Sequence, residues 1–137
     1  MVFAMKKVSV AVLVLLIVSY VIYSMSTRYI EDYSPSEIYQ AFQDDEIQAL
    51  IDFHYKDFLF RNVEVISYER SVLKEGKYSV ALHQESFWFP TVLCYLDFSE
   101  LKGVNEGDKV DISGRLTNYD NYDRVIFENC KIHEVFP

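Results

Sequence analysis

Hydrophobic and polar residues follow three different patterns along the chain, and each pattern predicts a different element. From Val8 to Met25 the sequence is apolar except for three serines, and no charged residue occurs between Lys7 and Arg28. A helix of this length would be roughly 27 Å long, about the thickness of the hydrocarbon core of a membrane. A helix buried in a globular core normally keeps a polar stripe. The pattern therefore predicts that residues 1–29 form a transmembrane anchor.

A cleaved signal peptide is the alternative interpretation of this segment. The apolar run is long for a signal peptide, and no Ala-x-Ala site follows it. Lys6 and Lys7 precede the run and the acids Glu31 and Asp32 follow it, so the positive-inside rule places the N-terminus in the cytoplasm. We expect a single-pass protein of the cytoplasmic (inner) membrane, with residues 30–137 forming a periplasmic or extracellular domain.

A helical pattern covers residues 35–53. Ser34, Pro35 and Glu37 have the spacing of an N-cap, a first-turn proline and the third residue of a capping box. Apolar residues then recur at helical spacing, interrupted by three consecutive acids centred on Asp45. The pattern predicts one helix, bent near Asp45. No His or Cys joins the acids, so we interpret them as a solvated face and expect no metal site.

Beyond this helix the hydrophobic period changes to two, which is typical of strands. A turn recurs about every ten residues, and a short helical segment separates the third and fourth strands. Gly114, inside the fourth strand, predicts a bulge or a bend. The pattern predicts an all-β domain with one preceding helix, folded as a five-stranded barrel or sandwich. The expected strands cover residues 59–70, 77–84, 91–98, 109–116 and 124–135.

The charge of the chain narrows the choice of partner. Three of the 13 basic residues precede residue 30, whereas all 21 acids follow it, so residues 30–137 carry a net charge of −11. Such a surface repels phosphate backbones and anionic lipid headgroups. We therefore expect no nucleic acid partner, and a basic protein or a cationic ligand fits better. The alternative is that this charge only keeps the domain soluble.

Two cysteines, Cys94 and Cys130, are the whole cysteine content of the chain. An even count outside the cytoplasm predicts a disulfide. The two residues are too far apart in sequence for a redox motif, and neither has a neighbouring zinc ligand. The alternative is a pair of buried free thiols that behave as small apolar groups.

Several stretches resemble a known family. "VLCYLDF", "VNEGDKVDISGRL" and "VIFENCKI" are similar to the second half of the tRNA-anti-like OB-fold family of small bacterial exported or membrane-anchored proteins, and "DDEIQALIDF" is similar to its first helix. The resemblance covers residues 36–133. It departs from the family before the first strand, where the family favours Gly-Lys and this chain has Asp57 to Phe60. The matching positions are Cys94, Gly107-Asp108-Lys109-Val110, Gly114 and Asn129-Cys130.

The resemblance implies a five-stranded OB-fold barrel with the strand order 1-2-3-5-4-1. In that order the third and fifth strands are neighbours, which would bring Cys94 and Cys130 together if both point inward. OB barrels bind ligands with strands two and three and with the loops that join strands one to two and four to five. The family has no established catalytic residues or cofactors to transfer to this chain, and we expect none.

The binding surface of such a barrel would lie on residues 70–77, 78–98 and 118–124. "SFWFP" holds three consecutive aromatic residues, which cannot all point inward, and an exposed aromatic often anchors a partner. The alternative is that two of them fold back to cap the barrel. The candidate ligand-binding or partner-binding residues are Tyr78, Phe87, Trp88, Phe89, Tyr119, Asp120 and Tyr122.

These features predict a non-enzymatic binding module at the cell envelope, for an envelope protein or a small ligand, attached to the membrane through residues 8–25. A second interpretation is an immunity or exclusion factor that neutralises a basic toxin or an incoming phage or conjugation component. His54, His83 and His133 each stand alone in sequence, and no hydrolase, zinc-protease or phosphate-loop motif occurs, so an enzyme is not expected.

Overall fold

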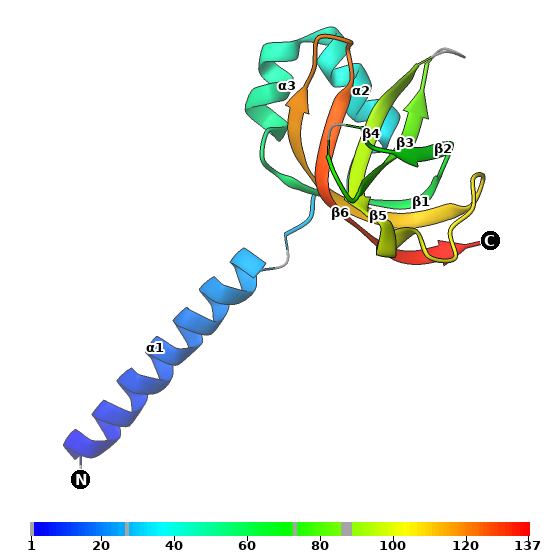
Figure 1. The fold of residues 1–137 in the computed structure, drawn as a ribbon. Coiled ribbons are helices and arrows are strands. Elements are labelled where there is room, and N and C mark those ends of the chain that lie inside the picture. The colour runs from blue at the N-terminus through cyan, green and yellow to red at the C-terminus, as the bar shows by residue number, and fades with distance from the viewer. Residues whose placement is uncertain (1, 27, 73, 86–88) are drawn as a thin grey trace.

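The computed structural model describes residues 2–26, 28–72, 74–85 and 89–137, and the side chains of helix α1 from residue 9 to residue 22. The elements follow one another as the sequence pattern predicts, with additional breaks (Figure 1). They are α1 (Val2–Ser26), α2 (Pro35–Asp44), α3 (Glu46–Phe53), β1 (Asp57–Glu64), β2 (Ser67–Arg70), β3 (Lys77–Gln84), β4 (Pro90–Asp97), the 3-10 helix η1 (Phe98–Leu101), β5 (Lys109–Tyr119) and β6 (Val125–Phe136).

Six strands form one sheet in the order β1-β5-β6-β4-β3-β2, in which only the β4–β6 pair is parallel. The sheet is open, so the prediction of a closed five-stranded barrel is wrong in both closure and strand number. The predicted neighbours are nevertheless found, because β4 and β6 are the predicted third and fifth strands. The two edge strands, β1 and β2, are separated in sequence by only Val65 and Ile66, which requires a strongly curled sheet (Figure 1).

The extra strand arises because the predicted first strand breaks at Val65. The Val65 amide donates to the Asp108 carbonyl oxygen (2.8 Å), and the Val65 carbonyl accepts from the Gly107 amide (2.7 Å). These bonds to the turn before β5 take the place of ladder bonds between neighbouring strands. Ile66 then begins a new pairing, since its amide donates to the Ala81 carbonyl of β3 (3.0 Å). In the sequence, Val65 and Ile66 are two consecutive apolar residues that shift the alternation by one position at this break, and the predicted range of residues 59–70 passed over that signal.

The predicted helix over residues 35–53 is two helices. The capping box is confirmed: the Glu37 amide donates to Ser34 Oγ (3.2 Å), and the Ser34 amide donates to Glu37 Oε1 (3.0 Å). The prediction of a single bent helix is wrong, because Asp45 has extended backbone angles and ends α2. Its carboxylate accepts from the Gln48 amide (3.1 Å) and so caps α3. One of the three consecutive acids is thus a helix cap.

The core lies between the concave side of the sheet and helices α2 and α3. Ile38 and Phe42 of α2 are buried in it. Three phenylalanines from β1 and β6 pack at its centre: Phe127 meets the rings of Phe58 and Phe60 edge-on, with ring centroids 5.5 and 5.3 Å apart. Burying rings of this size supplies much of the apolar area that stabilises a domain of this size.

Gly114 marks an irregularity of the β5–β6 ladder, as predicted, although the extra residue belongs to the partner strand. Ser113 pairs with Lys131 and Arg115 pairs with Glu128, so two steps along β5 match three along β6. A side chain at Gly114 has no room, because its Cβ would lie 2.6 Å from the Cys130 sulfur. The glycine is therefore required by the close approach of β6.

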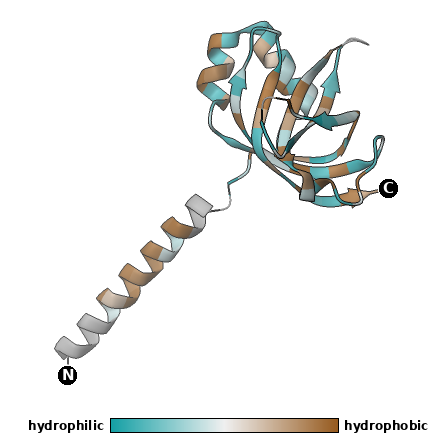
Figure 2. Cartoon of the chain, in the orientation of Figure 1, coloured by the Kyte–Doolittle hydropathy of each residue, from teal (hydrophilic) through white to brown (hydrophobic). Residues whose placement is uncertain are grey.

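Helix α1 projects away from the rest of the chain (Figure 1). The apolar side chains described in it are exposed around the helix, for example Leu15 (65%) and Tyr20 (69%), and Figure 2 shows most of this stretch in the hydrophobic colours. Over the residues that the structure describes, no helix meets the combined length and apolarity needed to cross a membrane. The transmembrane anchor stays a prediction.

Candidate ligand-binding groove

A groove with a volume of about 410 Å³ lies on the convex side of the sheet, over β4, β5 and β6. It is bordered by the β2–β3 loop and by the β5–β6 loop, the two connections that correspond to the binding loops of an OB barrel. Its lining residues are Tyr55, Lys74, Tyr95, Thr117, Asn118, Asp120, Arg124, Ile126 and Glu128. We call this hollow the sheet groove.

The floor of the sheet groove is the outward face of the sheet. Side chains along β4 and β6 alternate, so that Cys94 and Phe127 enter the main core. Tyr95 and Ile126 belong instead to a second, smaller apolar cluster that includes Leu93. Leu93 and Ile126 are buried in this cluster and Tyr95 is half-buried, so the Tyr95 ring is the apolar surface that the cluster offers to flat ligand groups.

Each side of the sheet groove carries a cation that is already paired. Lys74 forms an ion pair with Glu128, and its Nζ lies 4.9 Å from the centroid of the Tyr95 ring. Arg124 Nε lies 2.8 Å from Asp120 Oδ2. The two cations and the two carboxylates balance, so the local charge of the groove is near zero although the domain as a whole is acidic.

Asp120 holds the β5–β6 loop in shape. Its carboxylate accepts from the amides of Tyr122 (2.9 Å) and Arg124 (3.1 Å) as well as from the Arg124 side chain. The sequence predicted Asp120 as a ligand-binding or partner-binding residue. In the structure its oxygens are occupied by the loop itself, so its evident role is to fix the position of Arg124.

A second hollow of about 380 Å³ adjoins the sheet groove, because Arg124 lines both. Its other lining residues are Phe89, Tyr122 and Asp123. Phe89 (68% exposed) and Tyr122 (78%) present their rings to water, and the Arg124 guanidinium lies 5.3 Å from the centroid of the Tyr122 ring. We call this hollow the loop hollow. The structure thus brings together Phe89 and Tyr122, two of the predicted binding residues, from loops far apart in sequence.

Tyr119 faces helix α2 and is not part of either hollow. Its ring stacks on Phe42 with centroids 4.6 Å apart. Its hydroxyl donates to Asp123 Oδ1 (3.0 Å) and accepts from Gln43 Nε2 (2.7 Å). The pKa of Tyr119 is raised well above 10.0. Burial of the hydroxyl is the largest cause, and the hydrogen bond to Asp123 is the second. Tyr119 therefore joins the β5–β6 loop to the helix, and any effect on a ligand would be indirect.

The remaining aromatic candidates are Tyr78, Phe87 and Trp88. Tyr78 lies near the start of β3 and lines neither hollow, and its ring lies against the exposed ring of Phe98, with centroids 5.3 Å apart. Phe87 and Trp88 lie outside the described residues. Sequence reasoning missed Tyr55. It did not single out Lys74 and Tyr95, although they lie within residues 70–77 and 78–98, which were predicted as the binding surface.

Cys94 and Cys130 meet in the core, as the strand order predicted. Both are buried and both are free thiols in the structure. Burial raises the pKa of the Cys130 thiol, and a hydrogen bond with the Cys94 thiol adds to the rise. Thiols that hydrogen bond can be oxidised to a disulfide with little movement. Their bond stays a prediction.

The three histidines are separate from one another. His54 Nε2 lies 3.2 Å from the Thr117 carbonyl oxygen, His83 Nε2 lies 2.9 Å from Glu85 Oε1, and His133 Nε2 lies 2.7 Å from Ser113 Oγ. Among the described residues, no group of three or more His, Cys, Asp or Glu side chains is arranged to hold a metal ion.

The chain was compared with known proteins by sequence and by structure. No family model matches it, and no curated protein matches it. A crystal structure from Klebsiella pneumoniae, described as a "putative nucleic acid-binding lipoprotein", has a similar fold, with a TM-score of 0.58 and 16% sequence identity over 77% of this chain and 92% of that chain. At this identity the likeness shows the fold alone, and no family model confirms the resemblance to the tRNA-anti-like family.

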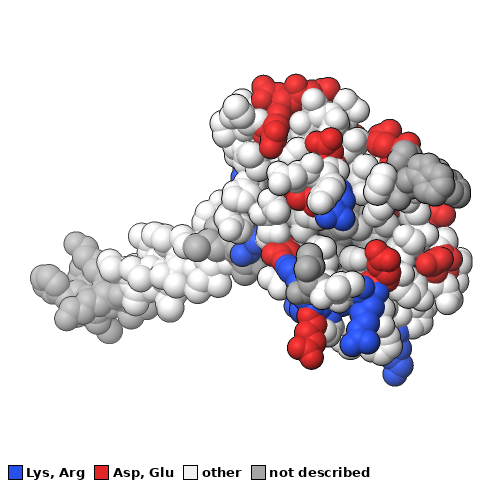
Figure 3. Space-filling view, turned by 45° about the horizontal axis from the view of Figure 1, so that its top comes forward, with Lys and Arg blue, Asp and Glu red and all other residues white. Residues whose placement is uncertain are grey.

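The exclusion of nucleic acid was wrong, because a protein of this fold is itself described as nucleic acid-binding. The physical error lay in treating the charge of the whole domain as the charge of its surface everywhere. Figure 3 shows one group of acidic side chains at the top of the view, whereas acidic and basic side chains are interspersed in its middle and lower part. The sheet groove, with two cations and two carboxylates, presents a nearly neutral surface to a ligand.

Proposed function

We propose that this chain is a non-enzymatic binding module, held at a membrane by α1, and that the sheet groove and the loop hollow together bind one extended ligand. The observation that carries the proposal is the continuity of the two hollows through Arg124. Along this track four aromatic side chains line the surface, one of them beneath a lysine and one beneath an arginine. They are Tyr55, Tyr95, Tyr122 and Phe89.

The ligand class that suits this track is a single-stranded chain bearing planar groups. Stacking on aromatic rings contributes about 1–3 kcal/mol per base in single-strand binding and tolerates many sequences. The same face of OB-type sheets binds oligonucleotides and oligosaccharides, and the Klebsiella protein of similar fold is described as nucleic acid-binding. A single-stranded oligonucleotide is therefore the first ligand to test.

The paired cations predict a weak dependence of oligonucleotide binding on salt concentration. Lys74 and Arg124 already neutralise Glu128 and Asp120, so they can contact at most two ligand phosphates. The slope of log K against log salt should then be no steeper than about −1.4 for a single strand. Affinity would come mainly from stacking.

Support for membrane attachment comes from α1. Its described apolar side chains are exposed on all sides, which is unfavourable in water and favourable in a lipid bilayer. The similar Klebsiella protein is described as a lipoprotein, which agrees with a location at the envelope. The anchor is tested by flotation of the full chain with lipid vesicles. Association that survives alkaline extraction would support the anchor, and release of the chain by alkali would contradict it.

The binding proposal is tested by fluorescence anisotropy of labelled single-stranded DNA and RNA with the full chain in detergent micelles. Tyr122→Ala should weaken binding about 5- to 160-fold, the loss expected for one stacked base. Phe98→Ala is the matched control, because Phe98 is also an exposed aromatic (66%) but lies outside both hollows. Equal losses in both variants, or no binding of the parent chain, would refute the proposal. The immunity interpretation stays a prediction that a toxin gene beside this one would test.

A further inference from the structure

A third hollow, of about 260 Å³, lies where the chain leaves the sheet toward α1. We call it the junction pocket. The net negative charge of the domain predicted that it repels anionic lipid headgroups, but three cations and only one carboxylate line this pocket, so its local charge is positive. Its lining residues are Arg28, Tyr29, Asp57, Ser113, Gly114, Arg115, Asn129 and Lys131.

The segment after α1 is fixed against the sheet, so the pocket is a built feature. The Ile30 amide donates to the Asp57 carbonyl (2.8 Å), and the Leu59 amide donates to the Ile30 carbonyl (3.0 Å). These bonds hold the preceding residues, Arg28 and Tyr29, beside β1 and β5. On the other wall, the Ser113 hydroxyl is hydrogen-bonded to His133.

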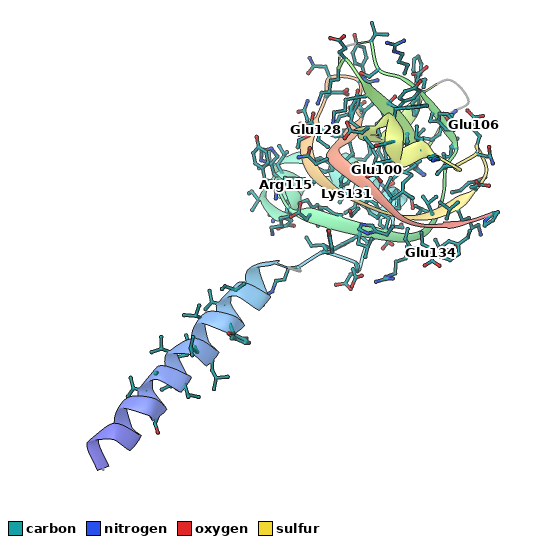
Figure 4. All side chains as sticks on the ribbon, turned by 60° about the horizontal axis from the view of Figure 1, so that its bottom comes forward. Glu100, Glu106, Arg115, Glu128, Lys131 and Glu134 are labelled. Atoms are coloured by element: carbon teal, nitrogen blue, oxygen red, sulfur yellow. The ribbon has the colours of Figure 1, made fainter. Side chains whose placement is uncertain are left out.

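The charges of the junction pocket are not balanced. Arg115 binds the only lining carboxylate, with Nε 3.0 Å from Asp57 Oδ1 and Nη2 3.2 Å from Asp57 Oδ2. Arg28 and Lys131 form no ion pair with any residue that the structure describes. The two side chains can both offer N–H donors to an anion. Figure 4 shows Arg115 and Lys131 on the neighbouring strands β5 and β6, on the side of the domain from which the chain runs to α1.

The position of the pocket identifies the kind of anion. Arg28 lies two residues beyond the last residue of α1, so if α1 enters a membrane, the pocket lies at the level of the headgroups. Basic residues beside a membrane helix gain about 1 kcal/mol each from anionic lipids, and arginine and lysine both bind phosphate oxygens well. We propose that the junction pocket binds the phosphate of an anionic lipid headgroup and so orients the domain on the membrane. This inference rests on the membrane attachment proposed above.

The test uses the full chain in maltoside micelles, which contain no phosphate, titrated with short-chain phosphatidylglycerol and followed by calorimetry. Arg28→Gln and Lys131→Gln should each weaken lipid binding by about fivefold, which corresponds to the loss of one cation near an anionic lipid. Lys102→Gln makes the same change in net charge at an exposed lysine outside the pocket and should leave binding unchanged.

The outcomes separate the sources of phosphate and the two proposals. Loss of binding on Lys102→Gln as well would mean a diffuse electrostatic effect and would overturn the pocket. Binding of inorganic phosphate without binding of the lipid would overturn the lipid assignment. If Lys131→Gln abolishes oligonucleotide binding, and the parent chain either binds no lipid or binds it as tightly as the variant does, the pocket binds nucleic acid. That result would overturn the lipid proposal as well. The groove variant Tyr122→Ala should bind the soluble lipid normally, so failure of the groove proposal leaves this result unchanged. Failure of the anchor is detected separately, by release of the chain from vesicles at alkaline pH.

Discussion

Replacing Gly114 with alanine tests the close contact between β5 and β6 most sharply. The Cβ of an alanine would lie 2.6 Å from the Cys130 sulfur and 3.2 Å from the Phe127 Cβ. Favourable non-bonded contacts require about 3.5–4.0 Å, so the sulfur would have to move by about 1 Å. Cys130 is buried against Cys94 and the core, and such a movement displaces packed neighbours.

Two effects of opposite sign decide the magnitude. Overpacking a well-packed core costs about 1–3 kcal/mol, whereas replacing glycine with alanine stabilises a protein by about 0.4–1 kcal/mol through the unfolded chain. The backbone of Gly114 is not in the left-handed region, so no strain from φ adds to the cost. We expect the free energy of unfolding to fall by about 1–2 kcal/mol.

The assay is urea unfolding of the full chain in detergent under reducing conditions, followed by near-ultraviolet circular dichroism. Cys130→Ala removes the obstructing sulfur, so in that background Gly114→Ala should cost less than about 0.5 kcal/mol, a coupling of about 1 kcal/mol between the two sites. A Gly114→Ala chain as stable as the parent would refute this account of the glycine, as would equal costs in the two backgrounds.

Three other predictions concern the cysteines, the helix cap and the tyrosines. In the chain isolated from an oxidising compartment and denatured without reductant, we expect no free thiols and a melting temperature that falls on reduction; two free thiols per chain would show that Cys94 and Cys130 stay reduced. Ser34→Ala removes the acceptor for the Glu37 amide and should lower the free energy of unfolding by about 1 kcal/mol in urea titrations, and a change below about 0.3 kcal/mol would contradict the cap. Tyr39 and Tyr119 have raised pKa values, mainly through burial, so the folded chain keeps these protons longer than the unfolded chain does. The contribution of the two tyrosines to the free energy of unfolding is complete below pH 10 and is lost as the pH rises above it. The free energy of unfolding should therefore decline above pH 10, and it should decline less steeply in Tyr119→Phe. Identical slopes in the parent chain and the variant would count against the prediction.

The strands were predictable because each alternates between the core and the outside. The predicted range of β3 agrees with the structure, and those of β4 and β6 differ by one residue at each end. The break at Val65 was marked in the sequence only by the adjacent apolar residues Val65 and Ile66, and its cause was not visible there, since the bonds that produce it join Val65 to a turn more than forty residues away. The break at Asp45 had a visible signal, because an aspartate followed three residues later by Gln48 is a typical start of a helix.

Part of the candidate site could also be predicted from the sequence. Exposed aromatic residues in loops could be identified from their polar neighbours, and Phe89 and Tyr122 lie together as the fold analogy suggested. The roles of Tyr95 and Lys74 depend on which strands and loops become neighbours, and the local sequence does not contain that information. The junction pocket was missed because Arg28, Arg115 and Lys131 are dispersed along the chain, and only the total charge was considered.

The central claim is that the sheet groove and the loop hollow act as one binding surface. The most direct measurement is the change in amide chemical shifts of the isotope-labelled chain, in detergent micelles, as a single-stranded oligonucleotide is added. The account predicts that the largest changes occur together at Tyr55, Tyr95, Tyr122 and Arg124, with little change at Phe98, which lines neither hollow. Changes confined to one hollow, or centred on Phe98, would contradict it.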